Sequence, residues 1–386
     1  MVLKWFYVVI SLSVITTFCV LTLLCPTHVR TIILRSREIS MNVVNTSFVA
    51  GRVRYALPAV ADPTNRPLRI VYWSNRDIWE FGTVRHTRTC RGKYQCEFIL
   101  DRSQYFRGDV ILVDVHRLRF FGGLPRFRFP HQKWAFFMIE SPRRMFTKLK
   151  PYEAAMFNFS ITYKTTSDLP HPYGKCRRLL PGEPRPPVKN RAFNKTDVAA
   201  WFISNCADKD SGRIRYSQEL QRYVSLHIYG RCGTYSCTKT EGNYCYEEML
   251  QKRYKFYMSF ENSFCDEYIT EKLYGVISLD IVPVVLGGGN YSAFLPPHSF
   301  IDIRNFASAK ELALYLKKLD ENDDLYNEYF AWKQDYECGV YLEQFSCDLC
   351  AYAHEHRTQK QTIDTIFDFW TEDDCTSVQD FYRGHF

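Results

Sequence analysis

Short apolar runs that lack polar alternation are the feature that most constrains the fold of this chain. They are rich in β-branched and aromatic residues, and most end at polar residues or glycine. Strands of this composition are typically buried on both faces, as in parallel sheets covered by helices. The predicted strands are Arg69–Trp73, Asp109–Val115, Trp134–Ile139, Trp201–Ile203, Val224–Tyr229, Tyr254–Phe260 and Ile281–Leu286.

Amphipathic helices are predicted between the later strands. Ser308 and Glu311 have the spacing of a capping box, and apolar residues follow at helical intervals. Residues 266–279 have a similar apolar stripe, formed by Ile269, Leu273, Val276 and Ile277. Alternating strands and helices indicate an α/β architecture with parallel sheets. A proline-rich basic stretch, residues 181–197, is predicted to link two domains.

The N-terminal region predicts a membrane anchor. Residues 5–25 are 21 consecutive uncharged positions, enough for a helix of about 31 Å, which is close to one bilayer core. A cleaved signal peptide is the alternative, but the small residues of a cleavage site are missing. We expect a cytosolic tail of residues 1–4 and a stem of residues 26–66.

Cysteines and sequons favour a lumenal body. The chain has 14 cysteines, of which 12 lie outside the predicted anchor, and this density is typical of an oxidising compartment. Four Asn-x-Ser/Thr sequons predict glycosylation at Asn45, Asn158, Asn194 and Asn290. The basic residues after the span would place the body in the cytosol by the positive-inside rule, but the cysteines and sequons together outweigh them.

The charge is divided unevenly along the chain. From Asp320 to the C-terminus there are 16 acidic and 4 basic residues, a net charge of −12. The whole chain carries +8, so the residues before Asp320 carry +20. A basic body suits anionic ligands, although the acidic tail could instead pack on it. A lumenal location excludes nucleic acid as the expected partner.

Polar clusters follow three of the predicted strands. Glu140 follows the strand that begins at Trp134, Ser204-Asn205 follows the next, and Glu261-Asn262 follows Phe260. Ligands of doubly wound sheets bind beyond the carboxyl ends of strands, so these clusters indicate a cleft. On the predicted helix that follows, Tyr268, Glu271, Lys272 and Gly275 share one face, which suits a pyrophosphate or, alternatively, is a solvated surface.

Three motifs that could bind metal or phosphate are weak. Asp208 and Asp210 form an Asp-x-Asp in a polar loop, which we interpret as solvated. Cys347 and Cys350 with nearby histidines resemble a zinc site, but a lumenal setting favours disulfides. Gly287-Gly288-Gly289 lacks the spacing of a nucleotide loop. The sequence therefore predicts no metal site.

The strand-end clusters resemble blocks of the α1,3-fucosyltransferase family. The most specific stretch is YMSFENSFCDEYITEKLY, residues 257–274, followed by VPVVLG at 282–287. Further similar blocks occur in the family's order, and the similarity covers residues 68 to 350. They are Ile139–Pro142, Phe157–Tyr163, Ser167-Asp168, Pro172–Gly174, Phe202–Asn205, Arg213–Tyr216 and Leu325–Trp332.

The resemblance implies a GT-B fold, in which two Rossmann-like domains face a central cleft. Residues 67–180 would bind the acceptor and residues 198–337 would bind GDP-fucose. Residues 338–386 would form a cysteine-rich acidic tail that packs back on the N-terminal domain. It also implies a single-pass type II protein of the Golgi membrane with a lumenal body.

The resemblance further implies an inverting transfer without a divalent metal. Glu140 matches the proposed general base, and Lys272 and Arg213 match residues that contact the pyrophosphate. The other matched donor-site residues surround the fucose and nucleotide or line the donor site; they are Glu261, Asn262, Tyr268, Glu271, Tyr163, Ser204, Asn205 and Tyr257.

Disulfides between the tail and the N-terminal domain are also implied by the resemblance. They would join Cys90 and Cys96, in some order, to Cys347 and Cys350. The pairing of the other eight cysteines stays open; they are Cys176, Cys206, Cys232, Cys237, Cys245, Cys265, Cys338 and Cys375. The tail beyond Cys350 has no counterpart in the family pattern.

The acceptor is left open between two glycans, a lactosamine-type arm and the innermost GlcNAc of an N-glycan. The extra cysteines are more typical of plant and invertebrate members, in which core fucosylation is common. A catalytically inactive glycan-binding protein on the same fold is the main alternative, but both Glu140 and Lys272 are present. A sulfotransferase would need a basic phosphate loop after the first strand, which is absent from the sequence.

Overall fold

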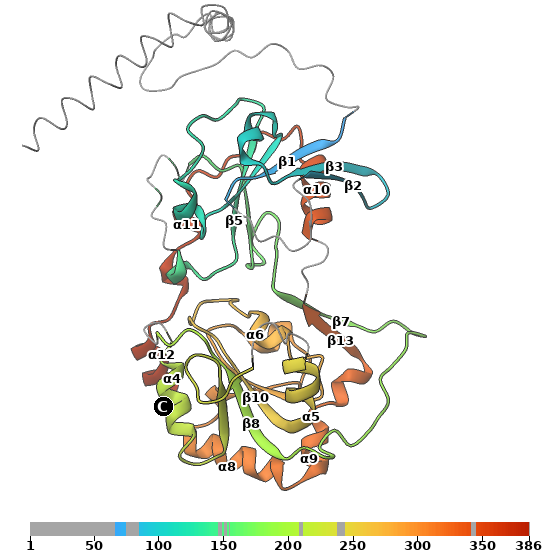
Figure 1. Ribbon diagram of the computed structural model, residues 1–386, viewed down its shortest axis with the longest axis vertical. Helices are drawn as coiled ribbons and strands as arrows, with labels where there is room; N and C mark the ends of the chain where they lie inside the picture. Colours follow the sequence, from blue (N-terminus) through green and yellow to red (C-terminus); the bar gives the residue numbers. More distant parts are fainter. Residues whose placement is uncertain are drawn as a thin grey trace, which may run out of the picture. The chain divides into compact units, whose positions relative to one another are not determined.

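The computed structural model describes residues 66–74, 85–145, 149, 153, 155–207, 211–237, 244–340 and 345–385. These residues form two parallel sheets with helices around them, as predicted from the sequence (Figure 1). Both sheets belong to one compact unit that begins at Arg66.

The first sheet has six strands in the order β2-β3-β1-β4-β5-β6. Strand β2 pairs antiparallel with β3, and the other neighbours are parallel. Strands β1 and β4 are almost entirely buried, as their apolar runs predict. The bounds are β1 Leu68–Tyr72, β2 Arg85–Cys90, β3 Tyr94–Ile99, β4 Val110–Asp114, β5 Lys133–Met138 and β6 Phe159–Thr162.

The second sheet has five strands, all parallel, in the order β12-β11-β10-β8-β9. All seven residues of β10 are buried. The strand predicted at Trp201–Ile203 begins earlier, because small residues before Trp201 pair with both neighbouring strands. The bounds are β8 Asp197–Phe202, β9 Leu226–Tyr229, β10 Tyr254–Phe260, β11 Val282–Leu286 and β12 Ile301–Asp302.

The parallel strands of both sheets have the same doubly wound order. If the parallel strands of each sheet are numbered along the chain, both sheets have the spatial order 2-1-3-4-5. The order therefore reverses between β1 and β4 in one sheet and between β8 and β10 in the other. Loops at such a point leave in opposite directions and open a crevice at the carboxyl ends of the strands.

Helices and short helical turns connect the strands. Helix α8 begins at the predicted cap, because the Ser308 hydroxyl accepts the Glu311 N–H. The Glu311 carboxylate accepts the N–H of Ala307, one residue before the N-cap, and not that of Ser308 as in a capping box. The α-helices are α4 Arg213–Leu220, α5 Gln251–Arg253, α6 Glu271–Tyr274, α7 Tyr291–Phe294, α8 Ala309–Asp320, α9 Asp323–Glu328, α10 Phe345–Glu355, α11 Ile366–Phe369 and α12 Val378–His385. The 3-10 turns are η3 Arg102–Arg107, η4 Leu118–Phe121, η5 Pro142–Arg144, η8 Ile303–Asn305, η9 Ala331–Gln334 and η10 Glu372–Asp374, and η7 Tyr244–Leu250 is a π-helix.

The long helix predicted over residues 266–279 is wrong. Only α6 is helical, and it begins after Thr270, whose extended backbone and hydroxyl cap its N-terminus. Glu267 has a φ of 56°, in the left-handed region. A right-handed helix therefore cannot run through this residue. The predicted apolar stripe is nevertheless fully buried. The sequence therefore identified the burial of this segment but not its backbone conformation.

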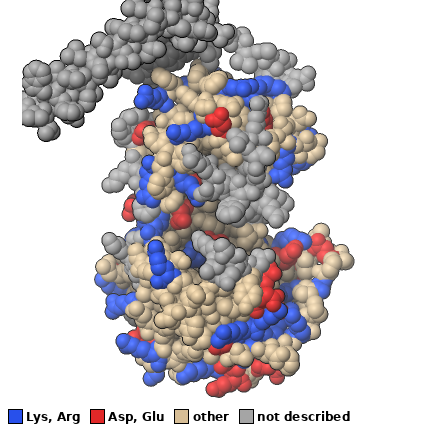
Figure 2. Space-filling model, viewed as in Figure 1, with Lys and Arg blue, Asp and Glu red and all other residues tan. Residues whose placement is uncertain are grey.

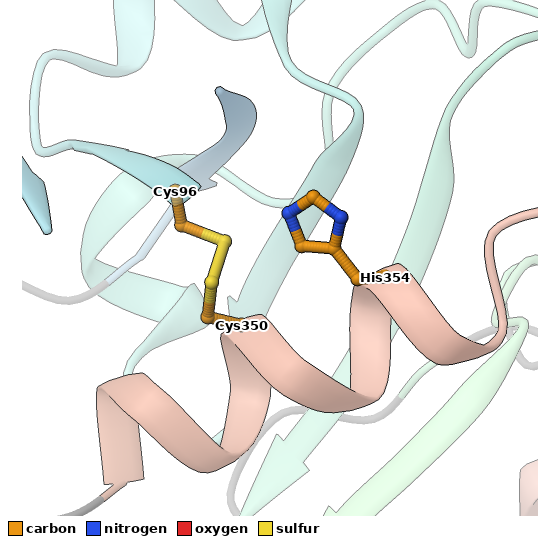
Figure 3. A group of neighbouring side chains, drawn as sticks. All are labelled: Cys96, Cys350 and His354. Carbon is orange, nitrogen blue, oxygen red and sulfur yellow. A yellow bond between two sulfur atoms is a disulfide. The ribbon is translucent and has the colours of Figure 1, made fainter. Parts of the chain in front are cut away.

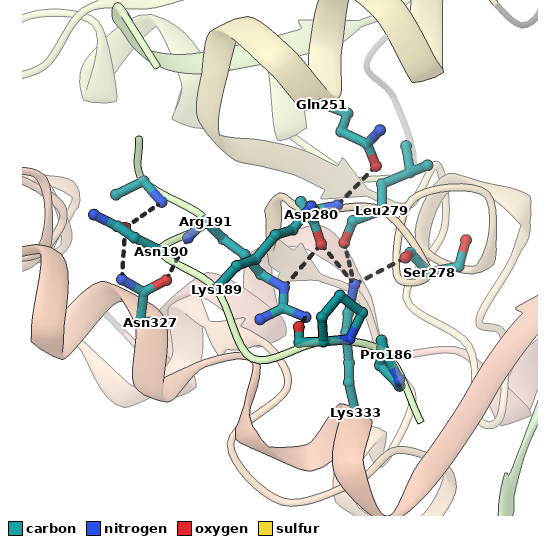
Figure 4. Close-up of polar contacts among 12 residues, drawn as sticks. Pro186, Lys189, Asn190, Arg191, Gln251, Ser278, Leu279, Asp280, Asn327 and Lys333 are labelled. Atoms are coloured by element: carbon teal, nitrogen blue, oxygen red, sulfur yellow. Dashed lines mark hydrogen bonds and ion pairs between the residues drawn. The ribbon is translucent and has the colours of Figure 1, made fainter. Parts of the chain in front are cut away.

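The segment predicted as a linker is held against α9 and the loop before β11 (Figure 4). Arg191 Nε lies 2.9 Å and Lys189 Nζ 2.7 Å from the Asp280 carboxylate. Lys333 Nζ adds hydrogen bonds to the Ser278 and Leu279 carbonyls. Burial alone would raise the pKa of Asp280, but these three cations lower it to about 2.

A two-stranded antiparallel ribbon forms where the chain passes from the first sheet to the second and where it returns. Strand β7, Gly174–Arg178, leads out of the first sheet, and β13, Tyr336–Val340, leads back toward it. A disulfide between Cys176 and Cys338 joins the two strands at paired positions. The ribbon is therefore cross-linked where the chain passes between the two sheets.

The C-terminal residues make contacts on both sheets. Helix α10 packs on β1, β2 and β3, and disulfides join Cys90 to Cys347 and Cys96 to Cys350. This is the link that the resemblance implied. Farther on, Cys375 is bonded to Cys265, on the segment that follows β10, and Phe381 of α12 stacks on Phe264 in the core of the second sheet. The tail thus reaches beyond the N-terminal half, to which the sequence analysis had assigned it.

Many acidic side chains of the C-terminal quarter pair within the chain. On the face shown in Figure 2, acidic side chains gather at the lower end of the view, in the region of α9. Asp320 lies 3.1 Å from Lys255 Nζ, Asp348 lies 2.8 Å from Arg91, and Asp374 pairs with Lys164. Internal pairing therefore accounts for part of the uneven charge without any partner.

Within the described ranges no helix has both the length and the apolar character needed to cross a bilayer. The predicted anchor, residues 5–25, and the sequon at Asn45 lie outside those ranges. Asn194 and Asn290 are exposed. Asn158 is buried, its side chain accepts the Trp134 N–H, and it donates to the Gln361 carbonyl. Asn158 is therefore committed to the core, which argues against the predicted glycan at this sequon.

Replacing Ser308 by alanine removes the side-chain cap of α8. We expect the free energy of unfolding to fall by about 1 kcal/mol, which is the usual cost of losing such a cap. Urea unfolding followed by fluorescence measures it, and Ser308→Thr, which keeps the hydroxyl, is the control. Equal stability of Ser308→Ala and wild type would show that the cap is unimportant here.

Candidate active site

A cavity of about 550 Å³ opens at the switch point of the second sheet, between the carboxyl ends of β8 and β10. This is the position at which doubly wound sheets bind ligands, and the volume is in the range of small-molecule sites. The lining residues are Phe202, Ile203, Ser204, Asn205, Arg213, Tyr229, Gly230, Cys237, Cys245, Tyr246, Tyr257, Asn262, Glu271 and Lys272.

Lys272 presents the positive charge of the short helix α6 to this cavity. Its Nζ donates to Thr270 Oγ1 at 2.8 Å and lies 3.2 Å from carboxylate oxygens of both Glu261 and Glu271. Burial alone would lower the pKa of Lys272, but Glu261 and Glu271 outweigh it and raise the pKa above its usual value. The side chain therefore stays charged at physiological pH.

Glu261 lies behind the cavity rather than in its wall. Its side chain is fully buried, and it accepts both the Thr270 N–H at 2.8 Å and the Thr270 hydroxyl at 3.0 Å. Burial raises the pKa of Glu261, and Lys272 partly counters this effect. The carboxylate thus fixes the start of α6 and holds Lys272, so its role is to position the cation.

Arg213 is the second cation in the wall. It is the first residue of α4 and is buried, with one guanidinium nitrogen donating to the Phe260 carbonyl at 2.9 Å. A longer bond of 3.4 Å reaches the Asn205 carbonyl. Arg213 therefore ties the ends of β8 and β10 together and places positive charge between them.

Polar and aromatic groups complete the wall. The Asn262 amide oxygen is buried without a hydrogen-bond partner among the described residues, so it can accept a bond from a ligand. Phe202 packs edge-on against Tyr229, Tyr246 and Tyr257, with ring centroids 5.1–5.8 Å apart. Such a wall offers flat apolar surface beside the cations.

Several wall residues were missed by the sequence analysis. Tyr229 is the last residue of β9 and Gly230 follows it, so both could have been found by examining the carboxyl ends of the predicted strands. Gly230 has a φ of 92°, and a Cβ there would lie 2.6 Å from the Ile203 carbonyl oxygen. Tyr246 could not have been found, since it depends on the Cys237–Cys245 disulfide. A Cys206–Cys232 disulfide joins the loops after β8 and β9.

Glu140 follows β5 of the first sheet and lies outside the cavity wall. It is half-buried, and its Oε2 accepts a hydrogen bond of 2.9 Å from the Tyr268 hydroxyl. Tyr268 and Tyr163 also lie outside the wall, and their rings pack on each other at 5.1 Å. The structure therefore brings seven of the predicted donor residues to the cavity, and Glu261, Tyr163 and Tyr268 lie elsewhere.

The cysteine and histidine cluster is occupied by a disulfide (Figure 3). Cys96, Cys350 and His354 lie close enough together to hold a metal ion, but the two sulfurs are bonded to each other. His354 Nε2 lies 2.9 Å from the Gln95 carbonyl oxygen and can donate to it. The cluster therefore offers no thiolate ligands. Asp208 and Asp210 lie outside the described residues.

A second carboxyl group, Asp114, ends β4 at the switch point of the first sheet. It is buried, it accepts the Arg117 N–H at 3.3 Å, and Arg117 Nε lies 3.5 Å away. Burial raises the pKa of Asp114 to about 7, Arg117 counters part of the effect, and Glu140 adds slightly to it.

Comparison with known proteins supports a single family. A model described as "Glycosyltransferase family 10 (fucosyltransferase) C-term" matches residues 192–369, and one described as "Fucosyltransferase, N-terminal" matches residues 65–174. Alpha-(1,3)-fucosyltransferase C of Drosophila melanogaster is 38% identical over 296 residues, covering 69% of this chain and 67% of that protein.

Two further relatives differ in the acceptor that their names state. Glycoprotein 3-alpha-L-fucosyltransferase A of Drosophila melanogaster is 34% identical over 281 residues, or 71% of this chain, which spans only 54% of that protein. The 4-galactosyl-N-acetylglucosaminide 3-alpha-L-fucosyltransferase 9 of Bos taurus is 32% identical over 305 residues, covering 76% of this chain and 80% of that protein.

Replacing Asp114 by asparagine should change how stability depends on pH. A carboxyl group whose folded-state pKa exceeds its unfolded value destabilises the fold once it ionises, so the wild type loses stability as pH rises from about 4 to 7. The variant lacks this loss. We expect its melting temperature, relative to wild type, to be higher at pH 8 than at pH 5. A difference that does not vary with pH would contradict the assignment.

Proposed function

Because this chain belongs to the glycosyltransferase family 10 fucosyltransferases, we propose that it transfers L-fucose from GDP-fucose to the 3-hydroxyl of a GlcNAc residue. The observation that carries the proposal is the cavity between β8 and β10, into which Lys272 and Arg213 present positive charge. A nucleoside diphosphate sugar is the anionic, partly aromatic ligand that such a wall suits.

The donor would bind with its pyrophosphate near Lys272 and Arg213. The aromatic wall offers stacking surface for a flat base or apolar contact for a sugar ring. The Asn262 amide oxygen can accept a bond from a donor hydroxyl. Glu271 lies at the mouth and holds Lys272 by an ion pair, so it would contribute through the lysine as well as by its own carboxylate.

The reaction needs a base for the acceptor and charge stabilisation for GDP. Glu140 would take the proton of the acceptor 3-hydroxyl. The oxygen of that hydroxyl would attack C1 of fucose from the face opposite the phosphate. The bond from C1 to the β-phosphate oxygen breaks, and the β-linked donor gives an α-linked product. The leaving GDP gains negative charge, which Lys272 and Arg213 would stabilise. No divalent metal is needed in this scheme.

The proposed architecture is the GT-B arrangement implied by the resemblance, with acceptor residues on the first sheet and donor residues on the second. The cellular location proposed is the Golgi lumen, with residues 5–25 as the membrane anchor. Six disulfides among the described residues support an oxidising compartment. The catalytically inactive alternative is not favoured, since the candidate base and cations are all present.

The names of the relatives are compatible with two acceptors, a lactosamine arm and the core of an N-glycan. A transfer assay with the full-length protein in detergent, labelled GDP-fucose and EDTA would distinguish them. The acceptors are lactosamine, its α-galactosylated and GalNAc-bearing relatives, and a trimmed N-glycopeptide. Transfer to any of these supports the proposal and identifies the acceptor. Binding of GDP-fucose without any transfer would support the inactive alternative instead.

Replacing Glu140 by glutamine keeps the shape of the side chain but removes its basicity. We expect kcat to fall roughly 100- to 10,000-fold, the usual contribution of a general base. The dissociation constant for GDP, measured by calorimetry, should stay within about twofold of wild type, since Glu140 lies outside the donor cavity. Turnover near the wild-type rate would exclude Glu140 as the base.

Replacing Lys272 by alanine should chiefly weaken donor binding. Loss of one charge-assisted contact predicts a GDP dissociation constant roughly 10- to 100-fold higher. Lys317→Ala is the matched control, because Lys317 is an exposed lysine of α8 outside the cavity wall. If both variants bind GDP equally well, Lys272 does not contact the pyrophosphate.

A further inference from the structure

The C-terminal helix α12 lies against the turn that leads to Arg213. A Cβ built at Gly212 would lie 2.8 Å from the Tyr382 ring and 3.2 Å from Val378 Cγ1, so α12 packs directly on this glycine. The Tyr382 hydroxyl donates to the carbonyl of Ser211 at 3.1 Å. Helix α12 therefore contacts both of the residues that come just before Arg213.

The start of helix α4 depends on such contacts. Gly212 is its N-cap, with a φ of 59° and no side chain that could accept an N–H of the helix. At α8, in contrast, the Ser308 hydroxyl accepts such a bond and fixes the first turn. Ser211 and Gly212 are both buried. The position of this turn is therefore set by what packs on it, and α12 supplies both a ring and a hydrogen bond.

The same part of the tail is fastened to the segment after β10. The Phe381 ring stacks on Phe264, with the ring centroids 3.9 Å apart. Just before α12, Cys375 is bonded to Cys265, and the Thr376 N–H donates to the Phe264 carbonyl at 2.8 Å. Both aromatic rings and both cysteines of these contacts are buried. Helix α12 is therefore held in place by a covalent bond and by core packing.

Helix α12 thus connects the two segments that bring positive charge to the donor cavity. The turn at Gly212 leads to Arg213, and the segment through Phe264 leads to Lys272. Both cations line the cavity. Cations stabilise a pyrophosphate best when they are held at its oxygens before the ligand arrives. A helix that touches both segments is placed to set the position of Arg213 relative to Lys272.

We propose that Tyr382 of α12 is a positioning residue for Arg213 in the donor site. The inference rests on the proposed function, in which Arg213 contacts the pyrophosphate of the donor. It gives a role to tail residues beyond Cys350, for which the resemblance implied none. A positioning role predicts weaker binding of GDP that depends on Arg213, whereas a purely structural role predicts a loss of stability that does not depend on it.

The test is the full-length Tyr382→Phe variant, which keeps the ring and removes the hydroxyl. We expect the dissociation constant for GDP, measured by calorimetry, to rise roughly 3- to 10-fold, the effect of one hydrogen bond. The KM for GDP-fucose should rise by a similar factor. Tyr352→Phe is the matched control, because that tyrosine belongs to the same tail but packs on Phe159 of the first sheet. GDP binding by Tyr382→Phe as tight as that of the control would overturn the inference.

A double-mutant cycle separates positioning from a general structural effect. If Tyr382 acts through Arg213, then adding Tyr382→Phe to Arg213→Ala should weaken GDP binding by less than about twofold. An equal loss of affinity in the two backgrounds would overturn the inference, as would GDP binding by Arg213→Ala as tight as that of the wild type. A wild type that binds GDP but transfers no fucose would overturn only the proposed reaction, because the cycle is read from GDP binding and decides the inference by itself.

Discussion

The buried Glu261 carboxylate organises the rest of the site. A charged group at this depth is tolerated only when it is paired and hydrogen-bonded. Here the Thr270 N–H, the Thr270 hydroxyl and Lys272 satisfy it. These bonds close residues 261–272 into one loop, and that loop carries Asn262 and Lys272 to the donor cavity and Tyr268 to Glu140. A single buried ion pair thus places groups of both the proposed donor site and the proposed base.

The strand pattern allowed much of this arrangement to be predicted. Apolar runs identified most of the strands, and the strand-end rule found Ser204, Asn205 and Asn262, which all line the cavity. The helix assigned to residues 266–279 was wrong for a physical reason. Its apolar spacing correctly predicts burial, but Glu261 and the Cys265–Cys375 disulfide hold the first part in an extended path. Local periodicity does not contain such long-range constraints.

Other parts of the site depend on contacts that one sequence does not reveal. Tyr246 reaches the wall from a segment closed by the Cys237–Cys245 disulfide. The sequon at Asn158 looks like a glycan acceptor until its side chain is seen to bond the backbone of Trp134. In each case the residue type is compatible with several environments, and the tertiary fold selects one.

The C-terminal tail links the two halves of the proposed active site. It is bonded to the first sheet at Cys90 and Cys96 and to the donor loop at Cys265. Between these points Trp370 packs on Tyr163, the tyrosine that supports Tyr268. Proton removal and departure of GDP must be aligned to within a fraction of an ångström. Near Glu140 the tail is held by the Cys265–Cys375 disulfide and by Arg143, which donates to the Cys375 carbonyl. These contacts restrict the movement of the segment after β10 relative to the turn after β5, and the proposed mechanism needs the two to stay aligned.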